Sequence, residues 1–452
     1  MNICALVLAS DLAASGFAQT DGYMWPLGGR PVIARVRDTL AEAGIRDQLY
    51  IIGQAPGSFR HILGEDIAYV LQEDPEHLGA AILQASSFLE SRDGLTLVVP
   101  GNMPLLEAAT LRQALRIFEQ QNCDALWVCA GSDQEPPRCQ ETFQPDFTQD
   151  RGGGLFIYRT ARLLSVLGRL GTGCHQPPQA GDSCPDLSLA LSVFEQDGLK
   201  VRCLTWPGQE LLQVKNTASL NQASDWLSQR IQQRLQQQGV TIEAPGLTYI
   251  EETVSVGART VIRAGCRLYG HTRIGENCVL GPDSTLEDCE VGADCHINRS
   301  VLEHSVAGTG CRIGPYAWLH DACWLDRECR VGAAEISNAV VGPGCVIDSR
   351  VFLADCDVGE GVRLGSGATT VNDDGSGLSY RSAIGNLAMI GANSSLVAPV
   401  DIGANAYIAA GSVITDPVPE FALALGRGRQ ALVPDWVRRR RARPEGDHLQ
   451  PL

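Results

Sequence analysis

Positive charge is scarce in this chain. Its 452 residues include 36 Lys and Arg against 52 Asp and Glu, which gives a formal net charge of −16 at pH 7. Such an acidic chain is repelled by phosphate backbones, so we exclude non-specific nucleic-acid binding. The one basic run, "VRRRRARP", lies near the C-terminus. We interpret it as a solvated tail, with contact to an anionic ligand or partner as the alternative.

Long apolar runs are also missing. No stretch of about 18 consecutive apolar residues occurs, so no membrane-spanning helix is expected. The N-terminus shows neither a basic segment nor a cleavable apolar segment, and we expect a cytoplasmic location. The 16 Cys include no C-x-x-C spacing, which argues against a zinc site and, in so large a chain, against a disulfide framework.

A local shortage of positive charge lies close to the N-terminus. Residues 3–8 form an apolar strand pattern, and residues 31–43 form a helical pattern. In nucleotide-binding folds, phosphates bind at such a strand–loop–helix junction. Residues 9–27, however, contain no Arg and no Lys. The junction therefore has the position of a phosphate site without the charge of one.

The C-terminal half repeats every six residues. Aliphatic residues recur at Val256, Ile262, Leu268, Ile274, Leu280 and Leu286, at Val291, at Ile313, Leu319, Leu325 and Val331, at Val341, Ile347 and Leu353, and at Ile384, Ile390, Leu396, Ile402, Ile408 and Ile414. This period fits neither a helix nor an alternating strand. It predicts a triangular β-solenoid with three short strands per coil and one inward aliphatic residue per strand.

Six cysteines occupy one slot of the repeat, four residues after an inward aliphatic residue. They are Cys266, Cys278, Cys295, Cys323, Cys329 and Cys345. The slot takes small inward side chains, and free Cys packs as a small hydrophobe. We therefore predict core packing rather than a redox or metal role.

One polar segment, residues 369–383, breaks the repeat and is predicted to project as a loop of functional interest.

The N-terminal half alternates short apolar runs with helical patterns. Strands are predicted at 3–8, 49–52, 67–71, 95–99, 125–129, 155–158 and 201–206, with helices at 31–43 and 108–121. This alternation favours an α/β domain with a mainly parallel, Rossmann-like sheet. A Gln-rich helix at 224–240 follows. The predicted domains are 1–225 (α/β), 226–245 (connecting helix), 246–430 (β-helix) and 431–452 (basic tail).

Together these parts resemble the bifunctional N-acetylglucosamine-1-phosphate uridylyltransferase/glucosamine-1-phosphate N-acetyltransferase family, which makes UDP-N-acetylglucosamine for peptidoglycan and lipopolysaccharide. The stretch "IGANSSLVAPVDIGANAYIAAGSVIT" carries much of the likeness. The resemblance implies a nucleotidyltransferase-like domain followed by a left-handed parallel β-helix. It also implies a homotrimer formed through the β-helix, and acetyl-CoA and Mg²⁺ as cofactors.

The family's nucleotide loop reads L-A-A-G-x-G-T-R-M-x-S-x-x-P-K-x-L, then A-G-K. In this chain Leu8-Ala9 matches its start and Gly28-Gly29-Arg30 its end, with eighteen residues between in both. The phosphate-binding groups are replaced: Asp11 and Ala13 stand for the two glycines, Ser15 for the Arg and Gly22 for the Lys. We therefore expect UTP to bind poorly or not at all.

The metal and uracil positions also depart from the pattern. The family's Gly-Asp magnesium ligand corresponds to Gly101-Asn102, and its second metal-binding Asn to Ala218. Asn is a weaker ligand than Asp for a hard cation. In the uracil stretch, Gln72 and Gly79 match and Ala80 replaces a Thr. Losses of a few kcal/mol at each position would together abolish most catalysis.

The acetyl acceptor positions are changed as well. By resemblance, Ser349 stands at the catalytic His, Phe352 at the sugar-binding Tyr and His320 at the phosphate-binding Arg, while "AAEISNA" lacks the expected Lys. Ser349 cannot act as a base at neutral pH, and Phe352 cannot hydrogen-bond. His320 could be a base, because free histidine has a pKa of about 6.5; the alternative is a solenoid His with no catalytic role.

The acyl-CoA positions are better retained. Asn372 and Gly375 match the family's N-Y-D-G loop, with Asp373 in place of the Tyr. Gly391, Ala410 and Arg427 fall where the family contacts the cofactor, and Ala392 replaces a Ser there. Arg427 could pair with a CoA phosphate. The alternative is that these glycines and alanines only maintain the turns and the packing.

Three hypotheses follow. The first is a non-catalytic or regulatory relative, assembled as a homotrimer or with an active paralogue. The second is an acyl-CoA-dependent acyltransferase with an altered acceptor. The third is a working bifunctional transferase with displaced catalytic groups.

Overall fold

The computed structural model describes residues 2–9, 21–53, 56–64, 67–72, 82, 85–131, 138–140, 154–173, 186–373, 375, 378–428, 430 and 432–441. It contains two compact units. One comprises Met1–Arg234 and Ile250–Glu252, and the other comprises Leu235–Tyr249 and Thr253–Leu452. None of the described helices is long and apolar enough to cross a membrane.

The first unit is built on an eight-stranded sheet. Its strand order is β5 (Ala68–Leu71), β4 (Asp47–Ile52), β1 (Ile3–Ala9), β6 (Leu95–Pro100), β9 (Gly154–Arg159), β7 (Ala125–Gly131), β10 (Val201–Pro207) and β8 (Arg138–Gln140). Strand β9 runs antiparallel to β6 and β7, and β8 antiparallel to β10; the other pairs are parallel. This confirms the expected mainly parallel, nucleotidyltransferase-like α/β fold.

Helices cover both faces of this sheet. They are α1 (Asp21–Met24), α2 (Val32–Glu42), α3 (Pro56–Leu63), α5 (Ser86–Glu90), α6 (Ala108–Gln120), α7 (Thr160–Gly173) and α8 (Asp186–Gln196). Along β1, Ala5 and Val7 belong to the core shared with α2, α3 and α6, whereas Cys4 and Leu6 belong to the core shared with α5, α7 and α8. Because strand side chains alternate between faces, one apolar strand serves both cores.

Helix α9 (Thr217–Gln237) begins seven residues before the predicted start at 224. Its first turn is capped reciprocally: the Ser219 amide donates to Asn216 Oδ1 at 2.9 Å, and the Asn216 amide donates to Ser219 Oγ at 3.0 Å. Such caps satisfy helix N–H groups that have no intrahelical partner. The sequence "NTAS" (216–219) therefore contained the capping signal for the start of this helix.

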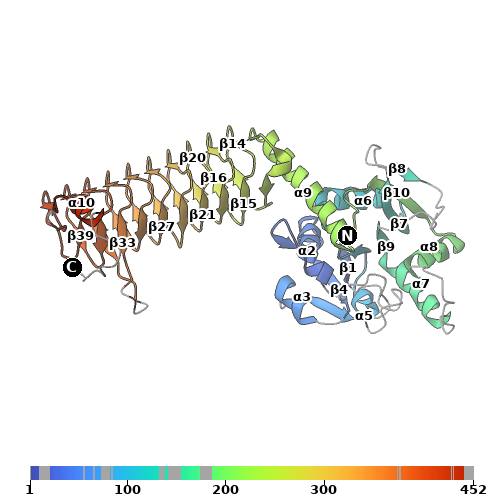
Figure 1. Ribbon diagram of the computed structural model, residues 1–452. Coiled ribbons are helices and arrows are strands. Elements are labelled where there is room, and N and C mark those ends of the chain that lie inside the picture. The colour runs from blue at the N-terminus through green and yellow to red at the C-terminus, as the bar shows by residue number, and fades with distance from the viewer. Residues whose placement is uncertain are drawn as a thin grey trace. The chain divides into compact units, whose positions relative to one another are not determined.

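The second unit is a left-handed parallel β-helix, as predicted, with short strands stacked in three sheets (Figure 1). The first sheet contains β11 (Thr241–Ile242), β14 (Val261–Ile262), β17 (Val279–Leu280), β20 (His296–Ile297), β23 (Arg312–Ile313), β26 (Arg330–Val331), β29 (Val346–Ile347), β32 (Arg363–Leu364), β35 (Met389–Ile390), β38 (Tyr407–Ile408) and β40 (Leu423–Ala424). The second contains β12 (Tyr249–Ile250), β15 (Arg267–Tyr269), β18 (Thr285–Glu287), β21 (Val301–Glu303), β24 (Trp318–His320), β27 (Glu335–Ser337), β30 (Phe352–Ala354), β33 (Thr369–Val371), β36 (Ser395–Val397) and β39 (Val413–Ile414). The third contains β13 (Ser255–Val256), β16 (Arg273–Ile274), β19 (Glu290–Val291), β22 (Val306–Ala307), β25 (Trp324–Leu325), β28 (Val340–Val341), β31 (Cys356–Val358), β34 (Ser382–Ile384) and β37 (Asp401–Ile402).

The repeat aliphatics and cysteines form the interior of this β-helix. Every aliphatic residue of the predicted repeat is at most 8% exposed. The six cysteines of the predicted slot are buried as free thiols, and Cys289, Cys311 and Cys356 are buried with them. In five successive coils, the cysteine that precedes the strand of the first sheet donates its thiol proton to a backbone carbonyl of the next coil, at 3.0 to 3.2 Å. These cysteines are Cys278, Cys295, Cys311, Cys329 and Cys345. These contacts bear out the packing role.

Short elements complete the chain. They are the hairpin β2 (Pro26–Leu27) and β3 (Arg30–Pro31), the 3₁₀ turn η1 (Pro245–Leu247) and α10 (Trp436–Arg441).

Within the β-helix, residues 372–381 separate β33 from β34, whereas Asp355 alone separates β30 from β31 in the preceding coil. An antiparallel bridge joins Asp373 to Ser379 inside this insertion. The break in the repeat is thus an inserted segment, as predicted.

Candidate functional site

Four of the predicted nucleotide-site residues in the described part of the chain lie at one edge of the sheet. Strands β5, β4, β1 and β6 are mutually parallel, so their carboxyl ends share an edge, and the order of connections reverses between β1 and β6. Leu8 and Ala9 end β1, Gln72 follows β5, and Asn102 lies just beyond β6. The Gly101 amide donates to the Leu8 carbonyl at 2.7 Å. Ligands of open α/β sheets bind at such a switch point.

Asn102 is held by the chain itself. Its Nδ2 donates to the Val214 carbonyl at 3.2 Å, and the Val214 amide donates to the Asn102 carbonyl at 2.8 Å. Ala218, at the second predicted metal position, lies exposed in the first turn of α9 and offers no side-chain oxygen. Neither residue offers a carboxylate: Asn102 has only the neutral Oδ1 of its amide, and Ala218 has no side-chain oxygen, whereas hard cations bind oxygen ligands and charged ones most strongly.

The end of the predicted phosphate loop is well ordered by packing. Gly28 and Gly29 form the turn between β2 and β3 with φ of +56° and +81°. A Cβ on Gly29 would lie 2.6 Å from a Glu251 carboxylate oxygen, and one on Gly28 would lie 2.8 Å from Arg35 Nη2. Arg30 pairs with Asp38 at 3.5 Å. The matching glycines therefore have a structural reason that is independent of any nucleotide.

Several predicted positions cannot be placed. Ser15 and Gly79, together with Asp11, Ala13 and Ala80, lie outside the described residues. Gly22, at the predicted Lys position, lies in α1, and a Cβ there would meet nothing within 4 Å. The site thus has room for a side chain at position 22, where this chain carries none.

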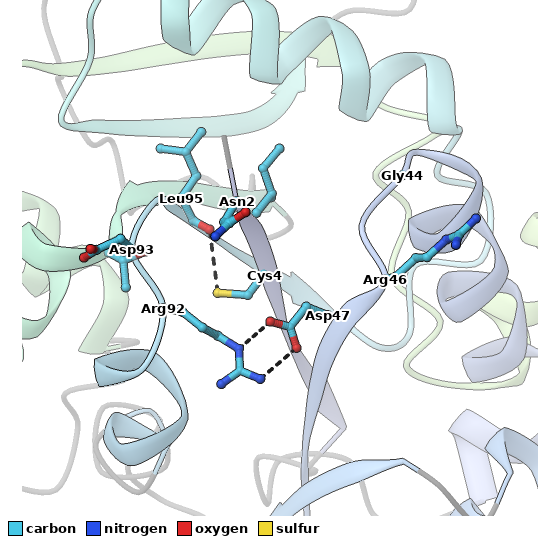
Figure 2. A pocket seen from close by; sticks show the side chains of 10 residues that line it. Asn2, Cys4, Gly44, Arg46, Asp47, Arg92, Asp93 and Leu95 are labelled. Atoms are coloured by element: carbon cyan, nitrogen blue, oxygen red, sulfur yellow. Dashed lines mark hydrogen bonds and ion pairs between the residues drawn. The ribbon is translucent and has the colours of Figure 1, made fainter.

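A cavity of about 280 Å³ lies at the opposite edge of the sheet, where β1, β4 and β6 begin (Figure 2). Arg92 fills much of its polar lining, since its Nη2 donates to Asp47 at 3.0 Å and its Nη1 to the Phe88 carbonyl at 2.8 Å. Arg46 extends away from this pair in Figure 2. Arg92, one of the two arginines that line the cavity, is thus already paired with Asp47, and the cavity lies at the edge opposite the carboxyl ends of the strands.

In the β-helix, His320 lies in a group of polar and aromatic side chains that we name the tryptophan–histidine cluster. It comprises Glu303, Trp318, His320, Asp321, Glu335 and Ser337. The register pairs Trp318 with Glu335 and His320 with Ser337 on neighbouring strands of the second sheet. Because their strands are parallel and in register, these side chains share the outer face of that sheet.

The His320 imidazole is oriented by a carboxylate. Its Nδ1 lies 2.6 Å from Asp321 Oδ2, and Ser337 Oγ donates to the same oxygen at 3.0 Å. Both contacts lower the pKa of the Asp321 carboxyl, with the His320 contact as the larger cause. The Trp318 ring stacks on His320 with centroids 4.2 Å apart. The structure therefore gives His320 a defined environment, which the sequence pattern had not indicated.

The other acceptor positions show no such arrangement. Ser349 is exposed at the corner before β30, and its Oγ lies 3.4 Å from the Ala333 amide, which donates to it. Phe352 lies on β30 and pairs in register with Glu335. His320 and Phe352 thus lie on the outer face of the same sheet, but neither Ser349 nor Phe352 supplies a group that titrates near neutral pH.

The predicted acyl-CoA positions come together in part. Arg427 Nη1 donates to the Ala410 carbonyl at 3.1 Å. A Cβ on Gly391 would lie 2.6 Å from the Ile408 carbonyl oxygen of the next coil, so packing alone requires a glycine there. Asn372 lies elsewhere, with its Nδ2 donating to Asp355 Oδ2 at 2.6 Å. Gly375 donates its amide to Asp373 Oδ1 within the insertion.

Comparison with known proteins agrees with this architecture. The MobA-like NTP transferase domain matches residues 5–170, the bacterial transferase hexapeptide (six repeats) matches 381–416, and the hexapeptide repeat of succinyl-transferase matches 271–298. The bifunctional protein GlmU of Brevibacillus brevis is 30% identical over 96% of this chain and 97% of its own length. The chain belongs to the bifunctional GlmU family.

Other GlmU relatives align over a similar length. The GlmU of Thermoanaerobacter pseudethanolicus is 30% identical over 97% of this chain and 98% of its own, and that of Caldanaerobacter subterraneus is 29% identical over the same shares. Among solved structures, a nucleotidyl transferase from Methanothermobacter thermautotroptrophicus aligns at 18% identity over 51% of this chain and 99% of its own, with a TM-score of 0.37. The GlmU relatives thus span both units of the fold.

Proposed function

We propose that this chain is a non-catalytic or regulatory GlmU relative in amino-sugar and cell-envelope metabolism, and that its α/β domain does not transfer uridylyl groups. The observation that carries the proposal is the use of Asn102 as a backbone tether to Val214. The side chain of Asn102 is a neutral amide, and its nitrogen is used in this bond. Asn102 therefore does not present a carboxylate to Mg²⁺. The absence of Arg and Lys between residues 9 and 27 supports the same proposal.

Nucleotide binding tests this proposal directly. We expect isothermal titration of the full chain with UTP and Mg²⁺ to give no saturable heat. A GlmU relative such as that of Brevibacillus brevis, titrated in the same buffer, is the positive control. Saturable, magnesium-dependent UTP binding by this chain would contradict the proposal.

The proposal extends to N-acetylation of glucosamine 1-phosphate. At the positions that the resemblance assigns to them, Ser349 provides no base and Phe352 provides no hydrogen bond to a sugar. The proposed role is then assembly, as a homotrimer through the β-helix or with an active paralogue. Native mass spectrometry of this chain alone, and mixed with an active GlmU, tests that role; a monomer under both conditions would overturn it.

A second candidate function is acyl-CoA-dependent transfer to an altered acceptor. The contact between Arg427 and the Ala410 carbonyl favours it, since it joins two predicted cofactor positions and leaves an exposed guanidinium. Arg427 would then pair with a CoA phosphate. A ligand that binds only the folded state raises the melting temperature. A melting temperature unchanged by acetyl-CoA would remove this candidate.

A further inference from the structure

Several apolar side chains are exposed together near the C-terminus. Leu432, Val433, Trp436 and Val437 are between 48% and 80% exposed. They belong to residues 432–441, which we name the C-terminal segment, and Figure 1 shows its helix α10 at the β39 end of the β-helix. Large apolar side chains that are exposed as a group, rather than singly, indicate a surface that a partner covers.

The same segment carries concentrated positive charge. Arg438–Arg441 are four successive arginines, and Asp435 is the one acidic residue between positions 432 and 441. Arg438 is 88% exposed and donates to Asp435 Oδ1 at 3.3 Å. Because the whole chain has a net charge of −16, its attraction for anions is confined to local basic surfaces such as this one. The charge of the C-terminal segment therefore favours an anionic partner.

Helix α10 is too short to span a membrane. Its six residues, Trp436–Arg441, rise about 9 Å, against the roughly 30 Å of the hydrocarbon core of a bilayer. The segment is divided along the chain, since the exposed apolar side chains come before Arg438 and the arginines follow. A short segment of this composition binds in the plane of a membrane surface, with its apolar side chains below the headgroups and its arginines among them.

An anionic bilayer surface satisfies both features of the C-terminal segment. A soluble phosphate pairs with arginine but leaves the four apolar side chains in water. An apolar protein groove covers those side chains but supplies no anion for four arginines. The headgroup region of an anionic bilayer brings phosphates next to an apolar boundary, and Trp is enriched at that boundary.

We propose that the C-terminal segment docks this chain reversibly on an anionic lipid bilayer. Leu432, Val433, Trp436 and Val437 enter the boundary between headgroups and acyl chains, and the charge of Arg438–Arg441 attracts the lipid phosphates. Docking goes beyond the proposed regulatory function and does not depend on it, since it uses neither the nucleotide site nor the acetyl-acceptor positions.

Cosedimentation of the full chain with lipid vesicles tests the proposal. One set of vesicles contains phosphatidylglycerol and phosphatidylcholine in equal parts, and the other contains phosphatidylcholine alone. At an ionic strength of about 0.1 M, we expect the chain to partition at least about 10-fold more strongly onto the anionic vesicles, and less strongly as salt is added. Equal partition onto both compositions, or no partition onto either, overturns the proposal.

Variants locate the binding surface. Trp436→Ala removes the aromatic anchor, and the double variant Arg438→Glu/Arg439→Glu reverses two charges; each should weaken partition at least about 10-fold. Arg312→Glu/Arg330→Glu is the matched control, because it makes the same charge change at two exposed positions of the first β-helix sheet. Melting temperatures verify that each variant folds. If the control weakens partition as much as Arg438→Glu/Arg439→Glu does, the proposal is overturned, even where Trp436→Ala proves unstable.

A change in the opposite direction completes the test. Asp435→Asn removes the one acidic group of the segment, and Asn tolerates the positive φ of +54° at this position. We expect it to strengthen partition onto anionic vesicles about 3-fold, because one repulsive charge is lost. Partition that is weaker than that of the wild type would count against a charge-driven surface and overturn the proposal.

Two further measurements separate a bilayer from other partners. A single-stranded oligonucleotide that binds through Arg438 and Arg439, without any partition onto vesicles, would assign the segment to a soluble polyanion and overturn the proposal. A loss of assembled mass in Trp436→Ala by native mass spectrometry, again without vesicle partition, would assign it to a subunit contact with the same consequence. Vesicle partition by a chain that also binds UTP would remove the proposed function and leave bilayer docking in place.

Discussion

Asn102 and Val214 are joined by two hydrogen bonds: Asn102 Nδ2 donates to the Val214 carbonyl at 3.2 Å, and the Val214 amide donates to the backbone carbonyl of Asn102 at 2.8 Å. A carboxylate cannot replace the first of these bonds, because it has no proton to donate. We therefore expect Asn102→Asp to lower the free energy of unfolding by about 1–3 kcal/mol, the cost of a lost bond and an unpaired, part-buried carbonyl.

Urea unfolding at pH 7 measures this loss. Asn102→Ala is the matched control, because it removes the same bond without adding a charge next to a carbonyl oxygen. The expected order of stability is wild type, then Asn102→Ala, then Asn102→Asp. An Asp variant as stable as the wild type would show that the amide donation is not needed.

The Gly28-Gly29 turn offers a second prediction about the same region. Gly29→Ala should destabilise the α/β unit by about 1–3 kcal/mol, because φ is +81° and the new Cβ would collide with the Glu251 carboxylate. Gly22→Ala is the control, since open space surrounds its Cβ and α1 is helical there. Thermal unfolding of both variants measures the difference. Equal melting temperatures would contradict the packing role of the turn.

The interior thiols predict a labelling pattern. Burial raises the pKa of Cys289 to about 11 and that of Cys356 to about 12, so both stay protonated and unreactive near neutral pH. We expect iodoacetamide to label the exposed Cys139 in the native protein, and to label the β-helix cysteines only after denaturation. Peptide mass spectrometry identifies the labelled sites. Rapid native labelling of Cys289 or Cys356 would contradict the assigned core role.

The ion pair of Asp357 and Arg381 predicts a pH dependence. Arg381 donates to both carboxylate oxygens at 2.6 and 2.8 Å and thereby lowers the pKa of Asp357 from its ordinary 3.8. The stabilisation is thus complete above about pH 4 and is lost as the pH falls through the lowered pKa. Arg381→Met should cost about 0.5–1 kcal/mol at pH 7, given the pair's exposure, and less at pH 2.5.

Paired urea titrations at the two pH values test this dependence. Arg427→Met is a suitable control, because Arg427 donates to the backbone carbonyl of Ala410, which does not titrate in this range. Its effect should be the same at both pH values. An Arg381→Met effect that is equal at pH 7 and pH 2.5 would contradict the charge-based account.

The β-helix was predictable from the sequence because the six-residue period follows directly from the spacing of its strands. Each coil buries one aliphatic residue per strand, so Ile384, Ile390 and Leu396 recur at six-residue steps and all lie in the interior. The start of α9 was less visible, because the Asn216–Ser219 cap lies before the Gln-rich stretch that suggested the helix. Strand β8 had no pattern of its own, since it is a three-residue edge strand.

The candidate site was predictable only in part. The resemblance assigned Asn102 to the nucleotide site and His320 to the acetyl-acceptor site. The sequence could not show that Asn102 bonds to Val214, because 112 positions separate them. Likewise, Glu303, Trp318, His320 and Glu335 belong to three successive coils, and only the register of the stack brings them together. Such contacts depend on tertiary structure rather than on local pattern.

The central claim is that the α/β domain of this chain does not transfer uridylyl groups. The most direct measurement is pyrophosphate release from UTP and N-acetylglucosamine 1-phosphate with Mg²⁺, using the full chain, with the GlmU of Brevibacillus brevis as the positive control. We predict no release above the enzyme-free background. Sustained turnover at a rate near that of the control would contradict the account.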